Sequence, residues 1–295
     1  MAPRLPGGVS RRRMAEVLRV GAPTIVGVGA FFVLDFADRA LLKQMVGLGE
    51  LGIYSVGYSM GMMMVVLVDG AFGSAWPPFF AAFVNRQDEA RELFGRILKY
   101  CLLVYGSVAL GFFLFARPVV HLLTAPEFHP AYTVVGVVAA AYALKACYLV
   151  LLPGLYFHRK LHLQAGIEWV AAGVNVALNL LLIPVLARDG AALATLGAYL
   201  ALTGLAFVVG RRYLPVRYDV PRLAACAGLL VGGAGASYLL ARLPLAANAA
   251  WGAALMAAFV ALAFCAVLDA DERRAVSERL RAFAPALHSA ARRPS

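Results

Sequence analysis

Charged residues are scarce in this sequence. Only 15% of its 295 residues are Asp, Glu, Lys or Arg, whereas 62% are hydrophobic. Soluble domains carry about 25% charged and roughly 45 to 50% apolar residues. This shortage of charge argues against a water-soluble fold and favours a protein that is surrounded largely by lipid.

Cysteine is also scarce, and its positions do not suggest chemistry. The four cysteines lie in apolar stretches, without a CxxC pair or a His/Cys spacing of the kind that binds zinc: Cys101, Cys147, Cys226 and Cys265. A GxxxxGK phosphate-binding loop is absent as well. We therefore predict no metal site, no cofactor and no ATP hydrolysis by this chain.

The sequence is rich in long apolar runs. Eight runs are long enough to cross a hydrocarbon core of about 30 Å. They cover residues 18–38, 51–75, 97–117, 131–156, 163–187, 190–210, 222–242 and 248–268. Runs this long and uniformly apolar are typical of helices and not of barrel strands. The predicted fold class is all-α, a polytopic membrane helix bundle of about eight transmembrane helices.

Most of the 27 lysines and arginines fall on one side of these spans. That side holds the amino-terminal segment 1–17, the loops after the second, fourth and sixth spans, and the tail 269–295. The other side carries Arg39, Lys43, Arg117, Arg188 and Arg242. Because basic loops stay in the cytoplasm, we predict that both termini are cytoplasmic.

The net charge of +11 is explained by this topology and by anionic lipid headgroups. Since no nucleic-acid motif accompanies the charge, we predict no nucleic-acid partner. The polar tail places apolar residues at helical spacing: Val276, Leu280, Phe283 and Leu287. This stripe predicts an amphipathic helix along the cytoplasmic interface.

Four ionisable residues lie within the predicted spans: Asp35, Asp69, Lys145 and Glu168. Such residues are costly in a membrane, so they usually face a bundle interior or a wet cavity. Counted from the predicted span ends, Lys145 lies near mid-membrane, Asp69 and Glu168 toward the cytoplasmic side and Asp35 toward the outer side. We therefore expect no single compact site.

Two interpretations of Lys145 remain open. Its ammonium could hold an anionic phosphate headgroup, or it could form a structural ion pair with Asp69 or Glu168. A similar choice applies farther along the first span, where Asp35 precedes Arg39 by four residues and Asp38 adds a second acid. This group either stabilises a helix end or, with Lys43 behind it, forms the outer mouth of a passage for an anionic lipid head.

Small residues and prolines predict local packing. Gly57 and Gly61, and again Gly228 and Gly232, have the GxxxG spacing that permits close helix contact. The run Trp76-Pro77-Pro78-Phe79-Phe80 removes two amide donors, which predicts a break or kink at the cytoplasmic end of the second span.

Three stretches carry a resemblance to a known family. Residues 178–195 read LNLLLIPVLARDGAALAT, residues 52–61 read GIYSVGYSMG, and residues 75–80 read AWPPFF. Together they resemble bacterial polysaccharide flippases of the multidrug/oligosaccharidyl-lipid/polysaccharide exporter superfamily. Members of this superfamily have two six-helix lobes around a central cleft and in some cases two extra terminal helices.

The resemblance implies that residues 18–210 form the second lobe, a six-helix flippase-like unit, and that residues 211–268 form the two additional helices. A first lobe would then be missing, so transport is expected to be incomplete unless a second copy or a separate chain supplies that lobe. The implied location is the bacterial inner membrane.

The implied activity is the movement of a lipid-linked oligosaccharide, carried on undecaprenyl diphosphate, by alternating access. Lys145, Arg39 and Lys43 are the residues that we expect to contact phosphate. Residues expected to line the cavity or bind a coupling cation are Asp35, Asp69, Glu168, Asn175 and Asn179. Asn179 has an alternative role in hydrogen bonding between helices.

Three other functions remain open. A drug/cation antiporter half would use a carboxylate such as Asp35 to exchange a proton or sodium ion. A membrane enzyme of glycan assembly is disfavoured, because the only DxD-like run is 269–271 and no sizeable soluble domain accompanies it. A non-transporting subunit or a truncated remnant of a transporter would also fit the missing lobe.

Overall fold

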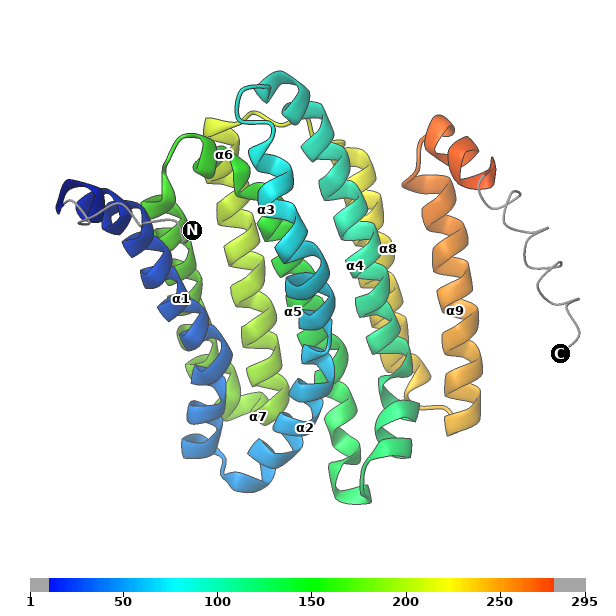
Figure 1. The fold of residues 1–295 in the computed structure, drawn as a ribbon. Helices are drawn as coiled ribbons and strands as arrows, with labels where there is room; N and C mark the ends of the chain where they lie inside the picture. The colour runs from blue at the N-terminus through cyan, green and yellow to red at the C-terminus, as the bar shows by residue number, and fades with distance from the viewer. Residues whose placement is uncertain (1–10, 279–295) are drawn as a thin grey trace, which may run out of the picture.

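The computed structural model describes residues 11–278, except for the side chains of residues 11–21, 23, 24, 69 and 71. The described residues form helices and connecting loops, without a strand (Figure 1). The elements are α1 (Arg11–Met45), α2 (Leu48–Met62), η1 (Val66–Phe72), α3 (Gly73–Ala81), α4 (Gln87–Leu123), η2 (Pro126–Ala131), α5 (Tyr132–Leu151), α6 (Pro153–Phe157), α7 (Leu161–Tyr213), α8 (Val220–Leu240) and α9 (Leu245–Ala266). The predicted all-α membrane bundle is confirmed.

Six helical stretches within the described residues are long and apolar enough to cross a membrane. One of them, α7, is a hairpin, because Ala187 has non-helical backbone angles of φ 49° and ψ −125°. The two arms run side by side in opposite directions (Figure 1). A side chain at Gly190 would come within 2.4 Å of the Leu182 carbonyl oxygen, so this tight turn requires glycine.

Seven of the eight predicted spans coincide with these six stretches, two of them with α7, and the first coincides with α1. The 35-residue α1 contains the first span, and the two arms of α7 contain the fifth and sixth. The largest difference lies in α4, which begins at Gln87 although the third span was predicted to begin at residue 97. Helix α1 likewise continues to Met45 although the first span was predicted to end at residue 38. The charged residues near that point mark the end of the apolar run but not the end of the helix.

The most buried helix is α5, which packs against α2, α4 and α7. Two glycines allow α2 to approach it closely, as the GxxxG spacing predicted. A side chain at Gly57 would lie 2.5 Å from the Ala131 carbonyl oxygen, and one at Gly61 would lie 2.6 Å from that of Val135. The second pair differs, because a side chain at Gly228 or Gly232 would meet no atom of the described residues within 4 Å.

The predicted break in the second span occurs earlier than expected. The helix changes to a π-helix at η1, and α3 then continues through Pro77 and Pro78 to Ala81. Trp76 holds this end in place, because its ring nitrogen donates to the Leu149 carbonyl oxygen at 2.8 Å. A tryptophan anchored to α5 therefore fixes the segment that the prolines would otherwise loosen.

Helices α8 and α9 pack against each other and against α4. We call the end of the bundle where α4 begins and α9 ends the basic end; it is uppermost in Figure 1. There, Lys99 of α4 forms an ion pair with Glu272 at 2.6 Å. Arg222 at the start of α8 pairs with Asp269 at 3.5 Å. These pairs connect the segment after α9 to the rest of the bundle.

Candidate functional site: a polar seam between α1, α2, α5 and α7

Asp38 on α1 is fully buried inside the helical bundle although its side chain is ionisable. The Tyr54 hydroxyl of α2 donates a short hydrogen bond to its carboxylate, and the Thr195 hydroxyl of α7 donates a longer one at 3.5 Å. The backbone N–H of Arg39 donates at 2.6 Å. Three helices therefore converge on one carboxylate, which needs such partners because a buried polar group without them is costly.

Asp35 lies one turn before Asp38 and is held by two tyrosines. The hydroxyls of Tyr142 and Tyr58 lie 3.2 Å and 3.4 Å from its Oδ1 atom, and 2.9 Å from each other. Asp35 also interacts electrostatically with Lys145 and, more weakly, with Arg39. We call the polar residues between α1, α2, α5 and α7 the polar seam, and the two acids and their tyrosines form its middle.

Lys145 on α5 faces α1. Its Nζ atom lies 5.3 Å from the ring centroid of Phe31 and 6.0 Å from that of Tyr142, and cations are attracted to such ring faces. The structure therefore brings Lys145 and Asp35 together, in contrast to the prediction that they lie at different depths. The physical reason is the length of α1, which places Asp35 about 15 Å before its end at roughly 1.5 Å per residue.

Arg39 stacks on aromatic rings. Its guanidinium carbon lies 4.6 Å from the ring centroid of Tyr58 and 5.7 Å from that of Phe36. Its Nε atom is buried and has no hydrogen-bond partner among the described residues. The expected intrahelical pair with Asp35 is not among the ion pairs of this part of the chain. Lys43, one turn farther on, is exposed.

Glu168 on α7 extends the seam toward the basic end. It is 3% exposed, and it accepts hydrogen bonds from the Tyr148 hydroxyl at 2.6 Å and from the Gln164 amide at 3.0 Å. Its carboxylate lies directly against the α1 backbone, since a side chain at Gly27 would come within 2.0 Å of Oε2. Glu168 therefore belongs to the α1–α7 contact.

Asn175 and Asn179 are both fully buried on the first arm of α7. The Asn179 side-chain amide donates to the carbonyl and to the Oδ1 atom of Asn175 at 3.0 and 3.1 Å. This leaves the Asn179 Oδ1 atom and the Asn175 Nδ2 atom without a partner within the described residues. Unpaired buried amide atoms are rare, so these two mark a polar position between the helices.

Helix register places Asn179 at the same height in the bundle as Asp38. The α1 helix and the first arm of α7 lie side by side and run in the same direction (Figure 1), with Glu168 against Gly27 and Trp169 donating to the Val26 carbonyl. Equal rise along both helices brings Asn179 to the level of Asp38. Thr195 reaches the same level from the returning arm, where it bonds Asp38.

Asp69 lies in η1, but its side chain is outside the described residues, as are Leu280, Phe283 and Leu287 of the predicted amphipathic tail. The predictions for these residues remain predictions. Residues that the sequence did not reveal are Tyr54, Tyr58, Tyr142 and Thr195. The one available signal was the spacing of Tyr54 and Tyr58, which places both on the same helix face.

One comparison with known protein families gives a match that covers the amino-terminal part of the chain. Residues 2–133 match the model of a family described as polysaccharide biosynthesis protein. The matched region includes residues 52–61 and 75–80 but ends before Lys145 and before the stretch 178–195. No curated protein matches the chain. The predicted resemblance to a polysaccharide biosynthesis family is confirmed for residues 2–133.

Proposed function

We propose that this membrane protein, which is related to polysaccharide biosynthesis proteins over residues 2–133, moves a lipid-linked oligosaccharide across the bacterial inner membrane. The family supports a role in polysaccharide export. The specific cargo, a sugar unit on undecaprenyl diphosphate, is part of the proposal. So is the orientation, with the basic end and both termini in the cytoplasm.

The observation that carries the proposal is the cluster of Lys145, Asp35 and Arg39 between membrane helices. Lys145 reaches Asp35 from α5, Arg39 lies one turn after Asp35 on α1, and both cations rest on the tyrosines that bond Asp35. Lys145, Arg39 and Lys43 form a series of cations leading from the bundle interior toward the outer end of α1. Such a series suits a diphosphate group that moves stepwise between charges.

The acidic and amide part of the seam supports coupling to a small cation. Asp38, Thr195 and the unpartnered Oδ1 atom of Asn179 lie at one level and offer oxygen ligands. Hard cations such as sodium prefer oxygen ligands, and a carboxylate supplies the compensating charge. Asp35, Asp69, Glu168 and Asn175 are the further residues that we propose for the cavity or the coupling path.

A second lobe completes the proposed transporter. Residues 18–210 supply one six-helix lobe and residues 211–268 the additional pair. Either a second copy of the chain or a separate membrane protein supplies the other lobe. Co-purification of the tagged chain with a differently tagged copy distinguishes these two sources.

The test is genetic complementation. The chain is expressed in a bacterial strain that lacks its own polysaccharide flippase, and surface polysaccharide is measured together with the amount of protein in the membrane. We expect restoration by the wild-type chain, or by the chain with its partner lobe, and loss with Lys145→Ala at an equal protein level. Lys160→Ala removes the same charge from the loop before α7 and serves as the control.

Normal polysaccharide with Lys145→Ala would contradict the site. Equal losses of polysaccharide and membrane protein would show that Lys145 serves the fold. Efflux of organic cations that depends on Asp35, without any return of polysaccharide, would favour the antiporter alternative.

A further inference from the structure

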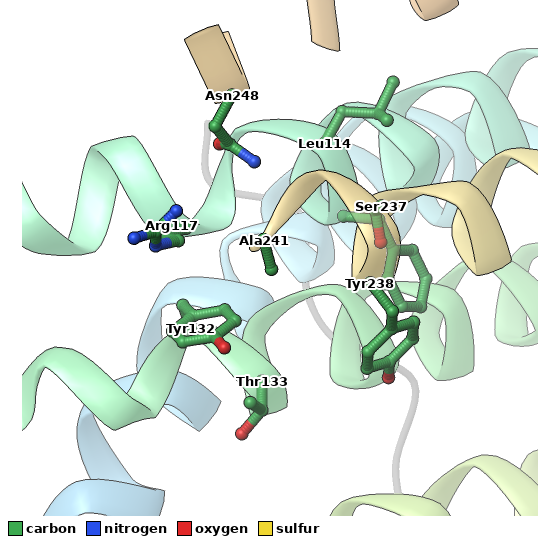
Figure 2. A pocket seen from close by; sticks show the side chains of 9 residues that line it. Leu114, Arg117, Tyr132, Thr133, Ser237, Tyr238, Ala241 and Asn248 are labelled. Carbon is green, nitrogen blue, oxygen red and sulfur yellow. The ribbon is translucent and has the colours of Figure 1, made fainter. Parts of the chain in front are cut away.

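A polar pocket lies at the end of the bundle opposite the basic end, and none of its lining residues belongs to the seam. Figure 2 shows Arg117 from α4, Tyr132 and Thr133 from the start of α5, Ser237 and Tyr238 from α8, and Asn248 from α9 around one small space. The enclosed part measures about 20 Å³, within about 320 Å³ of open space that continues outward. The enclosed part holds one water-sized group.

Arg117 brings an uncompensated positive charge to this pocket. Its Nη1 atom donates to the Leu243 carbonyl oxygen at 2.5 Å, and Arg117 takes part in none of the ion pairs among the described side chains. Asp189 lies on the Thr133 side of the pocket, where Thr133 donates to it at 2.6 Å; Arg188 lies 4.0 Å from it but forms its closer ion pair, at 2.7 Å, with Glu50. The Arg117 side of the pocket therefore favours an anion, and the Asp189 side does not.

Asn248 adds a second requirement. It is 2% exposed and lines the pocket, yet its Oδ1 atom has no hydrogen-bond partner within the described residues. Asn248 lies in the first turn of α9, and the free backbone N–H groups at the start of a helix also favour negative charge. A ligand that satisfies both Arg117 and Asn248 carries an anionic group and, next to it, a hydrogen-bond donor such as a hydroxyl.

An apolar cavity adjoins the polar pocket. The two share Phe113 and Tyr238, and the cavity of about 460 Å³ lies between α4, α5, α7 and α8. Its lining on α4 runs from Leu102 to Phe113, a distance of about 16 Å at roughly 1.5 Å per residue. This is about half of a hydrocarbon core of roughly 30 Å, the depth of one leaflet. The cavity thus fits a single hydrocarbon chain beside a polar head.

We propose that the two spaces together bind one anionic glycerophospholipid. Its phosphate lies against Arg117, a headgroup hydroxyl donates to Asn248 Oδ1, and one acyl chain fills the apolar cavity. The lipid then fills the joint between α4, α5 and the α8–α9 pair. This site is separate from the seam and does not depend on the transported substrate.

The test measures bound lipid directly. The full chain is purified in detergent and incubated with vesicles that contain equal amounts of phosphatidylglycerol and phosphatidylcholine with the same acyl chains. Native mass spectrometry then counts the lipids retained. We expect preferential retention of phosphatidylglycerol, which has both a net charge and hydroxyl donors, and about tenfold weaker retention in Arg117→Ala. Arg242→Ala, which removes an exposed charge at the same end, is expected to retain lipid normally.

The cavity has its own matched pair of variants, and both leave the Arg117 hydrogen bond intact. A side chain at Gly235, which lines the cavity, or at Gly228, which does not, meets no atom within 4 Å. We expect Gly235→Leu to lower the retention of both lipids and Gly228→Leu to leave it unchanged. Equal retention of the two lipids, equal effects within either pair of variants, or displacement by inorganic phosphate or a polyisoprenoid phosphate would overturn the proposal.

Discussion

At the scale of single residues, the seam shows how a membrane protein keeps a carboxylate in its interior. Asp38 accepts hydrogen bonds from hydroxyl groups and from a backbone amide. The hydroxyls of Tyr58 and Tyr142 bond Asp35, and the rings of the same two tyrosines contact Arg39 and Lys145. The side-chain donors come from α2, α5 and α7, whereas the two carboxylates are on α1. The charge therefore depends on the relative positions of the helices and, in turn, holds them together.

The contact between Tyr54 and Asp38 leads to a stability prediction. Tyr54→Phe removes the donor while Asp38 stays buried, and an acceptor left unsatisfied in this way costs about 1 to 3 kcal/mol. We expect a lower midpoint of thermal unfolding in detergent. Tyr105→Phe is the control, because Tyr105 is only half-buried and donates a longer bond of 3.3 Å to the Leu67 carbonyl oxygen. An equal effect of the two substitutions would contradict the role of the buried contact.

At the scale of elements, the turn of α7 is a point of backbone strain. Ala187 has φ 49° and ψ −125°, a conformation that glycine adopts far more easily than alanine. We expect Ala187→Gly to stabilise the protein by on the order of 1 kcal/mol, measured by thermal unfolding. Ala177→Gly, in regular exposed helix on the same arm, should destabilise it by about 1 kcal/mol. The same sign for both changes would show that the turn is not strained.

The ion pair between Lys99 of α4 and Glu272, in the segment after α9, is expected to depend on pH. Burial raises the pKa of Glu272, but hydrogen bonds from Lys99, Tyr100 and the Asp269 backbone outweigh it and lower the pKa to about 2. Because the folded pKa lies below the unfolded one, the contact stabilises the protein above about pH 4.5 and loses this effect as the pH falls toward 2.

Unfolding measured between pH 7 and pH 3 is expected to show this loss of stability in the wild type. In Glu272→Gln the corresponding slope should be absent, and the variant should be less stable than the wild type at pH 7. A slope that remains unchanged in the variant would assign the acid sensitivity to other carboxyl groups.

The sequence predicted the helices better than the site. Hydropathy reports directly on the hydrocarbon environment, so all eight apolar runs fall in helices. Hydropathy placed the end of α1 too early, because the charged residues around Asp38 were interpreted as the edge of the membrane. The seam joins residues far apart in the chain, such as Asp38 with Thr195 and Gly27 with Glu168. Such contacts depend on how helix faces meet, which apolar runs alone do not specify.

At the scale of the whole molecule, the proposed orientation has a simple test. In a background in which the exposed Cys265 is replaced by serine, Arg188→Cys and Arg159→Cys place single reactive thiols at opposite ends of the bundle. We expect a membrane-impermeant reagent to label position 188 in intact cells and position 159 only after permeabilisation. The reverse pattern would invert the proposed topology.

The glycine contacts of the bundle and its polar seam differ in how easily they can separate. Gly57 and Gly61 bring α2 against the α5 backbone, and Gly27 brings α1 against Glu168, so each pair forms a tightly fitted block. Between α1 and the α2–α5 block, in contrast, lie tyrosine hydroxyls and carboxylates, whose hydrogen bonds water can replace. We expect water that enters the bundle during a working cycle to enter along this boundary, while α7 stays in contact with both α1 and α5.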